Sequence, residues 1–487
     1  MFRYLKMLLP CLVLLLSLTA CGEPVTSPEP TSAATPASAT GTEAPTDAPI
    51  PTTRPTTVTV TLSEPDATPP ASATGTEAPT DAPIPTTRPT TATMTATLSE
   101  PEAAEGIPVV QPVLETHSVL DDIDEPPNNE RLGDADDPAI WVHPDDPSLS
   151  LVVAVLKDGG LDVYDLNGEV LQSISPDGVR YNNVDLAYGF PLGGTPTDII
   201  VATDRYQDRL VIFQVDPASR QLTDITDPNR PLLFTPEGAE SDGETTAYGV
   251  AVYRDPSSGT FYAFANRRET GEIAQFELID SGNGTIGWNR VRTMTVPTPE
   301  GGEPEDAQTE GMVVDPSMGF LYVGQENGGI WKFAAAPDGG SEGTRIHAVA
   351  PASNYLVADV EGLTIYFGPE GQGYLIASSQ GNHTFAVFRR EGNNDYIGSF
   401  QIGAAGDIDG VQECDGAMVL NVSLGERFPT GLLVVQDGHN APLFPVEDDG
   451  EIENANANFK FVPWEQVAAA FDPPLLIDPT SYQPRTP

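Results

Sequence analysis

The sequence predicts an all-β fold, a six-bladed β-propeller preceded by an export signal and a disordered Pro/Thr-rich linker. Between Leu132 and Asn440, short apolar runs alternate with polar residues at a period of two, which is typical of strands. Turn residues such as Asp-Pro, Asn-Gly and Gly-Gly separate these runs. One layout recurs about every 50 to 60 residues, a length that suits a blade of four strands.

The clearest copy of the repeat lies at residues 309–333. Glu310 opens an apolar run, the chain turns at Asp315 and Pro316, and a second apolar run ends at Glu326. If the two runs pair as an antiparallel hairpin, both carboxylates lie at the same end of one blade. Six units can be superimposed in this way, at residues 136–157, 182–205, 247–268, 309–326, 359–382 and 415–438.

Ring closure and one helix complete the expected fold. Either residues 119–132 or residues 458–462 should supply the strand that joins the last blade to the first. Residues 463–471 carry the one convincing helical pattern. A flat β-sandwich is the alternative fold, but it does not explain a repeat of this length.

The N-terminus predicts export. Arg3 and Lys6 precede an apolar run that is too short to span a membrane as an ordinary helix, and the run ends in a lipoprotein-type box at Cys21. We expect Cys21 to be lipidated, with a plain secretory signal as the alternative. The predicted domains are a signal peptide at 1–21, a linker at 22–112 and a propeller at 113–480.

The linker is composed mainly of Pro, Thr, Ala and Ser, and its residues 37–57 recur almost verbatim at 71–91. With few large apolar residues to bury, such a segment cannot offset the entropy lost on ordering. We expect a disordered, semi-extended spacer that holds the domain away from a membrane.

The charge of the chain excludes some partners. There are 71 acidic and 23 basic residues, giving a formal net charge of −48, which argues against nucleic acid or an anionic membrane surface as partner. Solubility is one interpretation of this acidity, and cation binding is the other. The cysteines are Cys11, Cys21 and Cys414, so no disulfide is expected in the exported domain.

Acidic and basic residues are expected at one mouth of the propeller, because first strands begin there and second strands end there. The basic side should hold Lys157, Arg205, Tyr248 and either Arg267 or Arg268. The acidic side should hold Asp136, Asp137, Glu310, Glu326, Asp359, Glu361, Asp409, Asp415 and Asp437. So many carboxylates repel one another unless a cation joins them.

Calcium suits this set, because it takes six to eight oxygen ligands, whereas zinc and copper prefer His or Cys and the five histidines are scattered. For Asp185 and the turn at 378–382 we favour structural calcium. For Glu310, Glu326, Asp359 and Glu361 we favour a catalytic role, because basic residues face them. A calcium half and a cationic half would bind a polyanion, and a calcium-bound water would be the nucleophile.

Several motifs taken together resemble the β-propeller phytases, the calcium-dependent alkaline phytases of bacteria. The resemblance covers about residues 132–471. Its motifs are Asp136–Trp141, Asn182–Asp185, Gln308–Met312, Ile330–Phe333, Glu361–Tyr366, Ala377–Asn382, Gln436–Gly438 and Asn458–Trp464. The resemblance implies a six-bladed propeller with several calcium ions that removes phosphates stepwise from phytate, inositol hexakisphosphate, as a 3-phytase.

By matching position, the resemblance implies roles for individual residues. Lys157, Arg205 and Tyr248 would contact phosphate. Arg268 stands where the pattern has a lysine, in a loop one residue longer, and Asp158 stands where a second lysine is common, which should weaken one phosphate contact. The implied calcium ligands are Asp137, Glu310, Glu326, Asp359, Glu361, Asp409 and Asp415.

Two other functions stay open: another calcium-dependent propeller hydrolase, such as a lactonase or phosphotriesterase, and a non-catalytic surface module that binds ligands through calcium. We expect a monomer on the outer side of the cell membrane, attached only through its lipid, or a secreted protein.

Overall fold

The computed structural model describes residues 56–61, 93–98, 106–121, 131–448 and 451–485. The expected signal peptide with Cys21 lies outside these residues, as does most of the linker, so the domain boundaries at 21 and 112 stay predictions. Inside the linker the structure describes two short strands that pair antiparallel, β1 (Thr56–Thr61) and β2 (Thr93–Leu98). Both are rich in threonine, whose β-branched side chain favours extended backbone.

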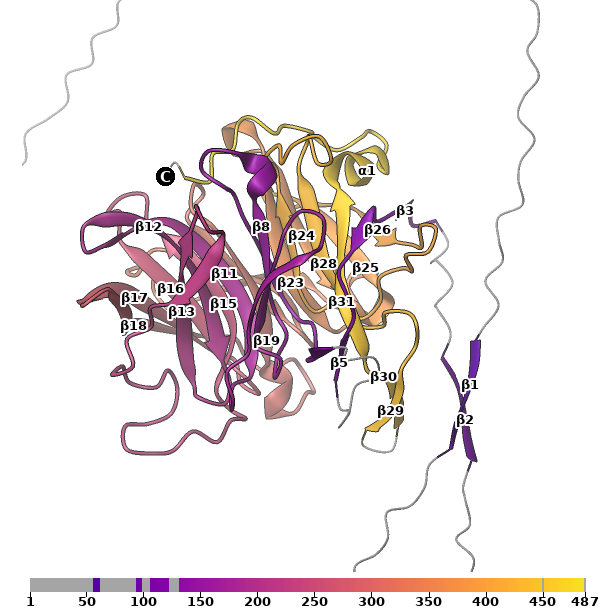
Figure 1. Cartoon of the computed structure of the whole chain (residues 1–487), viewed down its shortest axis with the longest axis horizontal. Coiled ribbons are helices and arrows are strands. Elements are labelled where there is room, and N and C mark those ends of the chain that lie inside the picture. Colours follow the sequence, from indigo (N-terminus) through magenta and orange to yellow (C-terminus); the bar gives the residue numbers. More distant parts are fainter. Residues whose placement is uncertain (1–55, 62–92, 99–105, 122–130, 449–450, 486–487) are drawn as a thin grey trace, which may run out of the picture. The chain divides into compact units, whose positions relative to one another are not determined.

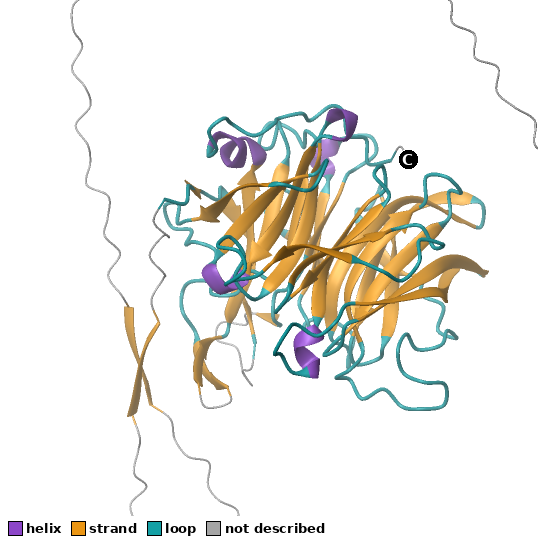
Figure 2. Ribbon diagram, turned by 180° about the vertical axis from the view of Figure 1, so that it is seen from behind, coloured by secondary structure: helices purple, strands orange, loops and turns teal. Residues whose placement is uncertain are grey.

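Six antiparallel sheets form the blades of a propeller, and strands dominate the ribbon (Figure 1, Figure 2). The innermost strands pack against one another in chain order, and the sixth packs against the first. This ring confirms the six-bladed propeller and excludes the flat sandwich. Blade one consists of β7 (Pro138–Trp141), β8 (Leu151–Val155), β9 (Leu161–Tyr164) and β10 (Val170–Ile174). Blade two consists of β11 (Tyr181–Leu192), β12 (Thr195–Asp204), β13 (Arg209–Asp216) and β14 (Gln221–Asp224).

The next three blades repeat this order. Blade three consists of β15 (Ala247–Arg254), β16 (Phe261–Arg267), β17 (Glu272–Gly282) and β18 (Thr285–Thr295). Blade four consists of β19 (Thr309–Asp315), β20 (Phe320–Gln325), β21 (Gly329–Ala334) and β22 (Thr344–Ala348). Blade five consists of β23 (Val360–Phe367), β24 (Gly373–Ser379), β25 (Thr384–Arg389) and β26 (Tyr396–Ile402), and β3 (Val109–Val110) adds a parallel strand at its outer edge.

Blade six is assembled from both ends of the described chain. Its inner strands are β27 (Ala417–Leu420), β28 (Leu432–Asp437) and β31 (Asn456–Pro463). The N-terminal strands β4 (Leu114–Glu115) and β5 (Val119–Leu120) pair antiparallel with β31, and β6 (Arg131–Leu132) pairs parallel with β5. Both segments expected to close the ring therefore take part in closing it. A separate hairpin, β29 (Pro445–Asp448) and β30 (Glu451–Asn454), precedes β31.

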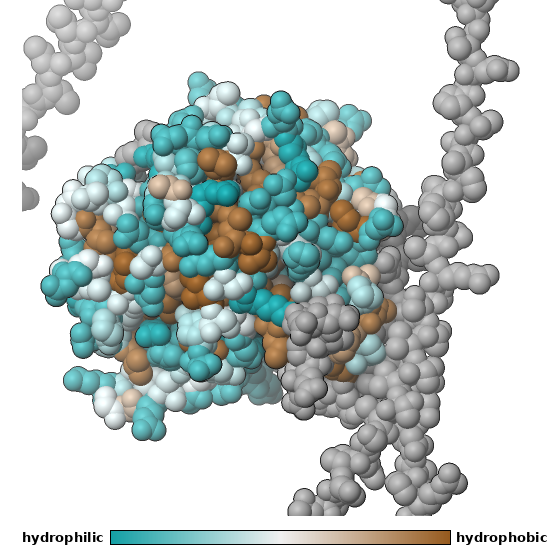
Figure 3. Space-filling model, viewed as in Figure 1, coloured by the Kyte–Doolittle hydropathy of each residue, from teal (hydrophilic) through white to brown (hydrophobic). Residues whose placement is uncertain are grey.

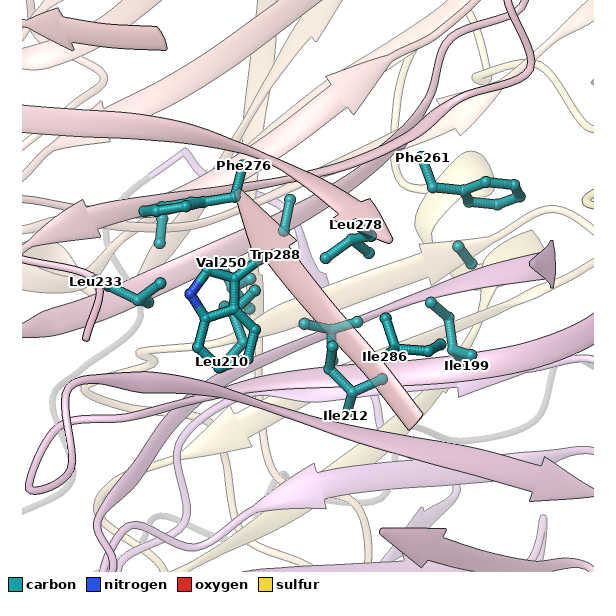
Figure 4. Packing of buried hydrophobic residues seen from close by; sticks show 14 of the residues in the cluster. Ile199, Leu210, Ile212, Leu233, Val250, Phe261, Phe276, Leu278, Ile286 and Trp288 are labelled. Carbon is teal, nitrogen blue, oxygen red and sulfur yellow. The ribbon is translucent and has the colours of Figure 1, made fainter. Parts of the chain in front are cut away.

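Among the described residues, six clusters of buried apolar side chains fill the six interfaces between neighbouring blades. Figure 4 shows the cluster between blades two and three, where Ile199 and Ile212 of blade two lie beside Ile286 of blade three. Because each blade buries apolar side chains on both of its faces, removing one blade would expose two cores. Polar residues cover much of the face seen in Figure 3, with apolar residues visible between them.

Helices are few and short in the described part of the chain (Figure 2). The helix expected at residues 463–471 is confirmed as α1 (Trp464–Ala469). Trp464 is buried and stacks on Tyr366, with ring centroids 4.3 Å apart. No described helix combines the length and apolarity that a membrane span requires.

The inner strands enclose a cavity of about 720 Å³ that C-terminal residues 481–485 also line. Tyr482 stacks on Phe367 with ring centroids 4.6 Å apart. Arg485 forms an ion pair with Asp198 at 2.5 Å and lies over the Tyr188 ring. Arg485 also lies over the Trp141 ring of blade one, so the C-terminal segment contacts blades one, two and five at the edge of the cavity.

A buried ion pair joins blades four and five. Arg390 Nε lies 2.6 Å from Asp315 Oδ2, and its Nη2 lies 2.8 Å from Oδ1, so the contact is bidentate. Both side chains are almost completely buried. Two charges removed from water are stable only as a pair.

We therefore expect Arg390→Met to lower the free energy of unfolding by about 3–5 kcal/mol, because Asp315 keeps its burial and loses its counter-charge. Denaturant unfolding measures this loss. The control is Arg389→Met, which removes an exposed pair with Glu391 and should cost less than about 1 kcal/mol. Equal losses in the two variants would contradict the assignment.

Candidate active site

The side chains of the site project from a β-bulge that recurs in four inner strands. The pairing register shifts between Tyr181 and Val184, and equivalent shifts follow Ala247, Thr309 and Val360. A bulge turns a side chain away from the regular alternation and often lies beside a functional site. The first residues in the four bulges are Asn182, Tyr248, Glu310 and Glu361.

Glycines let these strands approach closely. A Cβ on Gly249 would lie 2.1 Å from the carbonyl oxygen of Glu310, and one on Gly311 would lie 2.2 Å from that of Glu361. Gly362 meets the Asp415 carbonyl in the same way, and Gly416 meets that of Asp136. At each of these glycines, the space that a side chain would fill is occupied by the backbone of an acidic residue of the next blade.

Three buried carboxylates result from this packing. Glu310, Glu326 and Glu361 are 4 %, 8 % and 5 % exposed, and each offers an oxygen within 4.8 Å of the others. Asn182 donates to Glu310 over 2.7 Å. Gln308 Nε2 lies 2.8 and 2.9 Å from the two oxygens of Glu326. Three of the four residues expected to be catalytic, Glu310, Glu326 and Glu361, are therefore brought together.

Burial raises the pKa of all three groups, and repulsion between carboxylates adds to the rise at Glu326 and Glu361. The pKa of Glu326 rises to about 8, mainly through burial and then through the charges of Glu310 and Asp359. Burial is also the main cause of the raised pKa of Glu310 and of Glu361. Without a cation, the Glu326 carboxyl therefore keeps a proton near neutral pH.

Other predicted acids border this group. Half-buried Asp359 and more deeply buried Asp415 both act electrostatically on Glu326 and Glu361. Asp136 is buried, and the charge of Glu310 helps to raise its pKa after burial itself. Asp137 accepts a 3.0 Å hydrogen bond from the Val184 amide.

The donor set fits a hard divalent cation. Every ligand atom in the group is a carboxylate oxygen. Glu361 Oε2 and Asp136 Oδ1 are buried and have no hydrogen-bond partner. Buried polar atoms in proteins are normally satisfied, so these two oxygens are available to coordinate an ion. Glu310, Glu326 and Glu361 are the residues that would hold it, with Asp136, Asp359 and Asp415 beside them.

The basic residues lie next to the acids. Lys157 Nζ is 2.5 Å from Asp134 and 3.4 Å from both Asp136 and Asp415, so it lies at the junction between the acidic and basic sides. The Arg205 guanidinium lies 5.5 Å from the centre of the Tyr248 ring.

Tyr248 connects the two sides. Its hydroxyl hydrogen-bonds to Glu310, which limits the rise in the pKa of that carboxyl. Arg268 binds Glu244 at 3.1 Å and Glu269 at 2.7 Å. Arg267, the alternative to Arg268, forms a 3.7 Å pair with Glu272.

Three predicted metal ligands have other partners in this structure. Asp409 and Asp437 both bind the buried ammonium of Lys460. Asp185 accepts from the amides of Leu186 at 2.7 Å and Val252 at 2.6 Å. The turn at 378–382 contributes Gln380, which donates to Asp415 over 2.6 Å.

Sequence reasoning assigned no role to Asn182 and Gln308, and it considered Gln380, the third amide that holds an acid in place, only as part of a turn expected to bind structural calcium. Gln308 also accepts from the Glu269 amide at 2.7 Å, and so links the Arg268 loop to Glu326. Each of the three lies within a motif or turn identified in the sequence, so its position in the repeat could have indicated that it lies beside the site.

The fold and site define a β-propeller that combines a candidate metal site with an arc of arginines at one mouth. Comparisons with known proteins identify the family. The family model described as phytase matches residues 90–486. A curated 3-phytase of Bacillus subtilis (strain 168) is 40% identical over 336 residues, covering 69% of this chain and 80% of the relative. The chain belongs to the phytase family.

Solved structures with similar folds are more distant. An auxiliary nutrient binding protein from Bacteroides thetaiotaomicron has a TM-score of 0.41 at 10% identity, covering 76% of this chain and 80% of its own. The Cps50 (Swd1) β-propeller domain from Myceliophthora thermophila has a TM-score of 0.35 at 12% identity, covering 67% of this chain and 83% of its own.

Gly311→Ala tests the close approach of β19 and β23. Its Cβ would collide with the Glu361 carbonyl, so we expect a loss of about 1–3 kcal/mol of stability and a displaced carboxylate group. Gly319→Ala is the comparison, because nothing lies within 4 Å of a Cβ there, although its φ of +73° adds backbone strain. Calcium titration distinguishes the two variants. We expect weaker calcium binding in Gly311→Ala but not in Gly319→Ala, and equally weakened binding in both would contradict the argument.

The stability of chelator-treated protein should fall as pH rises. The pKa of Glu326 goes from a usual 4.5 to about 8, so the folded state holds a proton that the unfolded state has released between these values. Melting temperatures at pH 6 and pH 8 measure this. We expect a lower value at pH 8, a smaller difference in Glu326→Gln, and the larger gain from added calcium at pH 8. A higher melting temperature at pH 8 in chelator would contradict the prediction.

Proposed function

We propose that this protein is a calcium-dependent phosphomonoester hydrolase that releases phosphate stepwise from phytate, with the activity of a 3-phytase. One observation carries the proposal: a buried group of three glutamates adjoins Arg205, Tyr248 and Arg268 at one mouth of the ring. Membership of the phytase family and the relative named 3-phytase support it.

Calcium would be held by Glu310, Glu326 and Glu361, with Asp136, Asp359 and Asp415 nearby. When bound, it would make a water molecule more acidic and would neutralise charge on the phosphoryl oxygens. An acidic protein needs such an ion to accept a polyphosphate, because its own carboxylates would otherwise repel the substrate.

The chain's own residues bind and orient the substrate. Arg205 and Arg268 present guanidinium groups, which suit phosphate oxygens through paired N–H donors. Burial, followed by the charge of Glu310, raises the pKa of Tyr248. The phenol therefore stays protonated and can donate a hydrogen bond to a phosphoryl oxygen. Lys157 lies between this arc and the acids and can pair with a phosphate once calcium shares its carboxylates.

We further propose that the protein is exported as a monomer and attached to the outer side of the cell membrane through Cys21. The lipoprotein box and the short apolar run support this. The repeated Pro/Thr-rich linker would then space the propeller from the membrane.

Phosphate release from calcium phytate, with and without chelator, tests the function. We expect release to stop in chelator and to return with added calcium. Glu326→Gln and Asp359→Asn should each lower kcat by roughly 100-fold or more while circular dichroism is retained. Glu342→Gln, an exposed acid outside the site, is the matched control.

Other outcomes would decide against the proposal. Full activity in chelator would reject calcium dependence. Phytate binding without release would indicate a binding module. Release from a lactone or phosphotriester panel, with none from phytate, would indicate a different hydrolase.

A further inference from the structure

Arg180 has no role in the site as described so far, yet it lies beside the phosphate-binding arc. The Arg205 amide donates to the Arg180 carbonyl over 2.9 Å. Thr246 continues the row, because its hydroxyl donates to the Arg205 carbonyl at 2.7 Å and its own carbonyl accepts from the Arg268 amide at 2.9 Å. Backbone contacts thus hold three arginines of two blades along one arc.

Each of these arginines is covered by a more exposed carboxylate. Arg180 binds Asp158, and the two side chains are 19 % and 44 % exposed. Arg205 lies 3.8 Å from Glu244, with exposures of 10 % and 65 %. Arg268 also binds Glu244, at 3.1 Å. The guanidinium groups are therefore held by the fold, while their counter-ions lie on the solvent side.

The three cations act on one another. Burial lowers the pKa of Arg205, and the charges of Arg268 and Arg180 lower it further. Neighbouring cations favour an anion that can bridge them. An exposed carboxylate adds little to the stability of such a pair, whereas phosphate carries more charge and accepts paired hydrogen bonds from guanidinium.

We propose that Arg180 is a further phosphate-binding residue, and that Asp158 and Glu244 are internal counter-ions that substrate phosphates displace. The proposal rests on the proposed function and adds a determinant of substrate preference to it. A phosphate remote from the reacting one would reach Arg180, so the residue would favour substrates with several phosphates over simple monoesters.

The ion pair also changes the interpretation of Asp158. From the sequence, an acid at a position where lysine is common should simply weaken a phosphate contact. In the structure this acid is paired with Arg180. Arg180 therefore supplies a positive charge near the position where lysine is common, and Asp158 partly neutralises that charge.

The test compares Arg180→Gln, Asp158→Asn and the double variant. With calcium phytate, Arg180→Gln should raise KM roughly tenfold with kcat nearly unchanged, the loss of one charged contact. Asp158→Asn should lower KM severalfold, and should have no effect when Arg180 is already replaced. With p-nitrophenyl phosphate, which has one phosphate, KM should stay the same in all three. Arg389→Gln, which removes a surface arginine of blade five, is the control.

A binding measurement separates this inference from the proposed function. Calorimetry of calcium-loaded protein with inositol hexakissulfate measures polyanion affinity without any turnover, and Arg180→Gln should weaken it roughly tenfold. If wild-type protein releases no phosphate from phytate, the proposed function fails, while weaker hexakissulfate binding still supports Arg180. If Arg180→Gln matches Arg389→Gln in both KM and hexakissulfate affinity, or raises KM equally for both substrates, the inference is overturned.

Discussion

The repulsion among carboxylates that the fold forces together is the interaction on which this structure depends. Glu310 and Glu361 project from bulges of adjacent inner strands, and glycines allow the two backbones almost to touch. Hydrophobic packing between blades opposes the repulsion, because separating the strands would open the buried clusters. The grouped carboxylates are therefore stabilised by added positive charge, which either protons or a divalent cation can supply.

A second constraint is that residue contacts run all the way around the mouth and return to their starting point at Lys157. Lys157 bonds to Tyr181 through the backbone, the arginine row follows, and Gln308 then links the Arg268 loop to Glu326. From Glu326 the contacts pass through Asp359 and Gln380 to Asp415, which binds Lys157 again. Every blade contributes to these contacts, so the acidic and basic sides hold fixed positions relative to each other.

Much of the fold was predictable because it follows from repeated local patterns. Period-two runs and turn residues identified six units, and the structure has six blades with β19 and β20 pairing as expected. The acids Glu310, Glu326 and Glu361 were placed together by their equivalent positions in the repeat. The linker, Cys21 and the expected boundaries concern residues that mostly lie outside the described part of the chain.

Contacts that depend on exact side-chain partners were not predictable. Asp409 and Asp437 read as part of the acidic arc, but Lys460 lies close enough to pair with both. The Asp185 carboxylate accepts hydrogen bonds from backbone amides, and no pattern of residues in the sequence indicates such a role. Asp158 and Arg180 lie 22 residues apart in the sequence and meet beside the bridge that Lys157 and Tyr181 form between two blades.

The construction of blade six from both chain ends sets an order for assembly. Strands β4 and β5 can find their partner only after β31 has been made, so a growing chain carries an open ring until residues 456–463 are present. Asp136 and Asp415 come from blades one and six, which are neighbours in the ring. A chain that lacked β31 would therefore have neither a closed ring of blades nor a complete mouth.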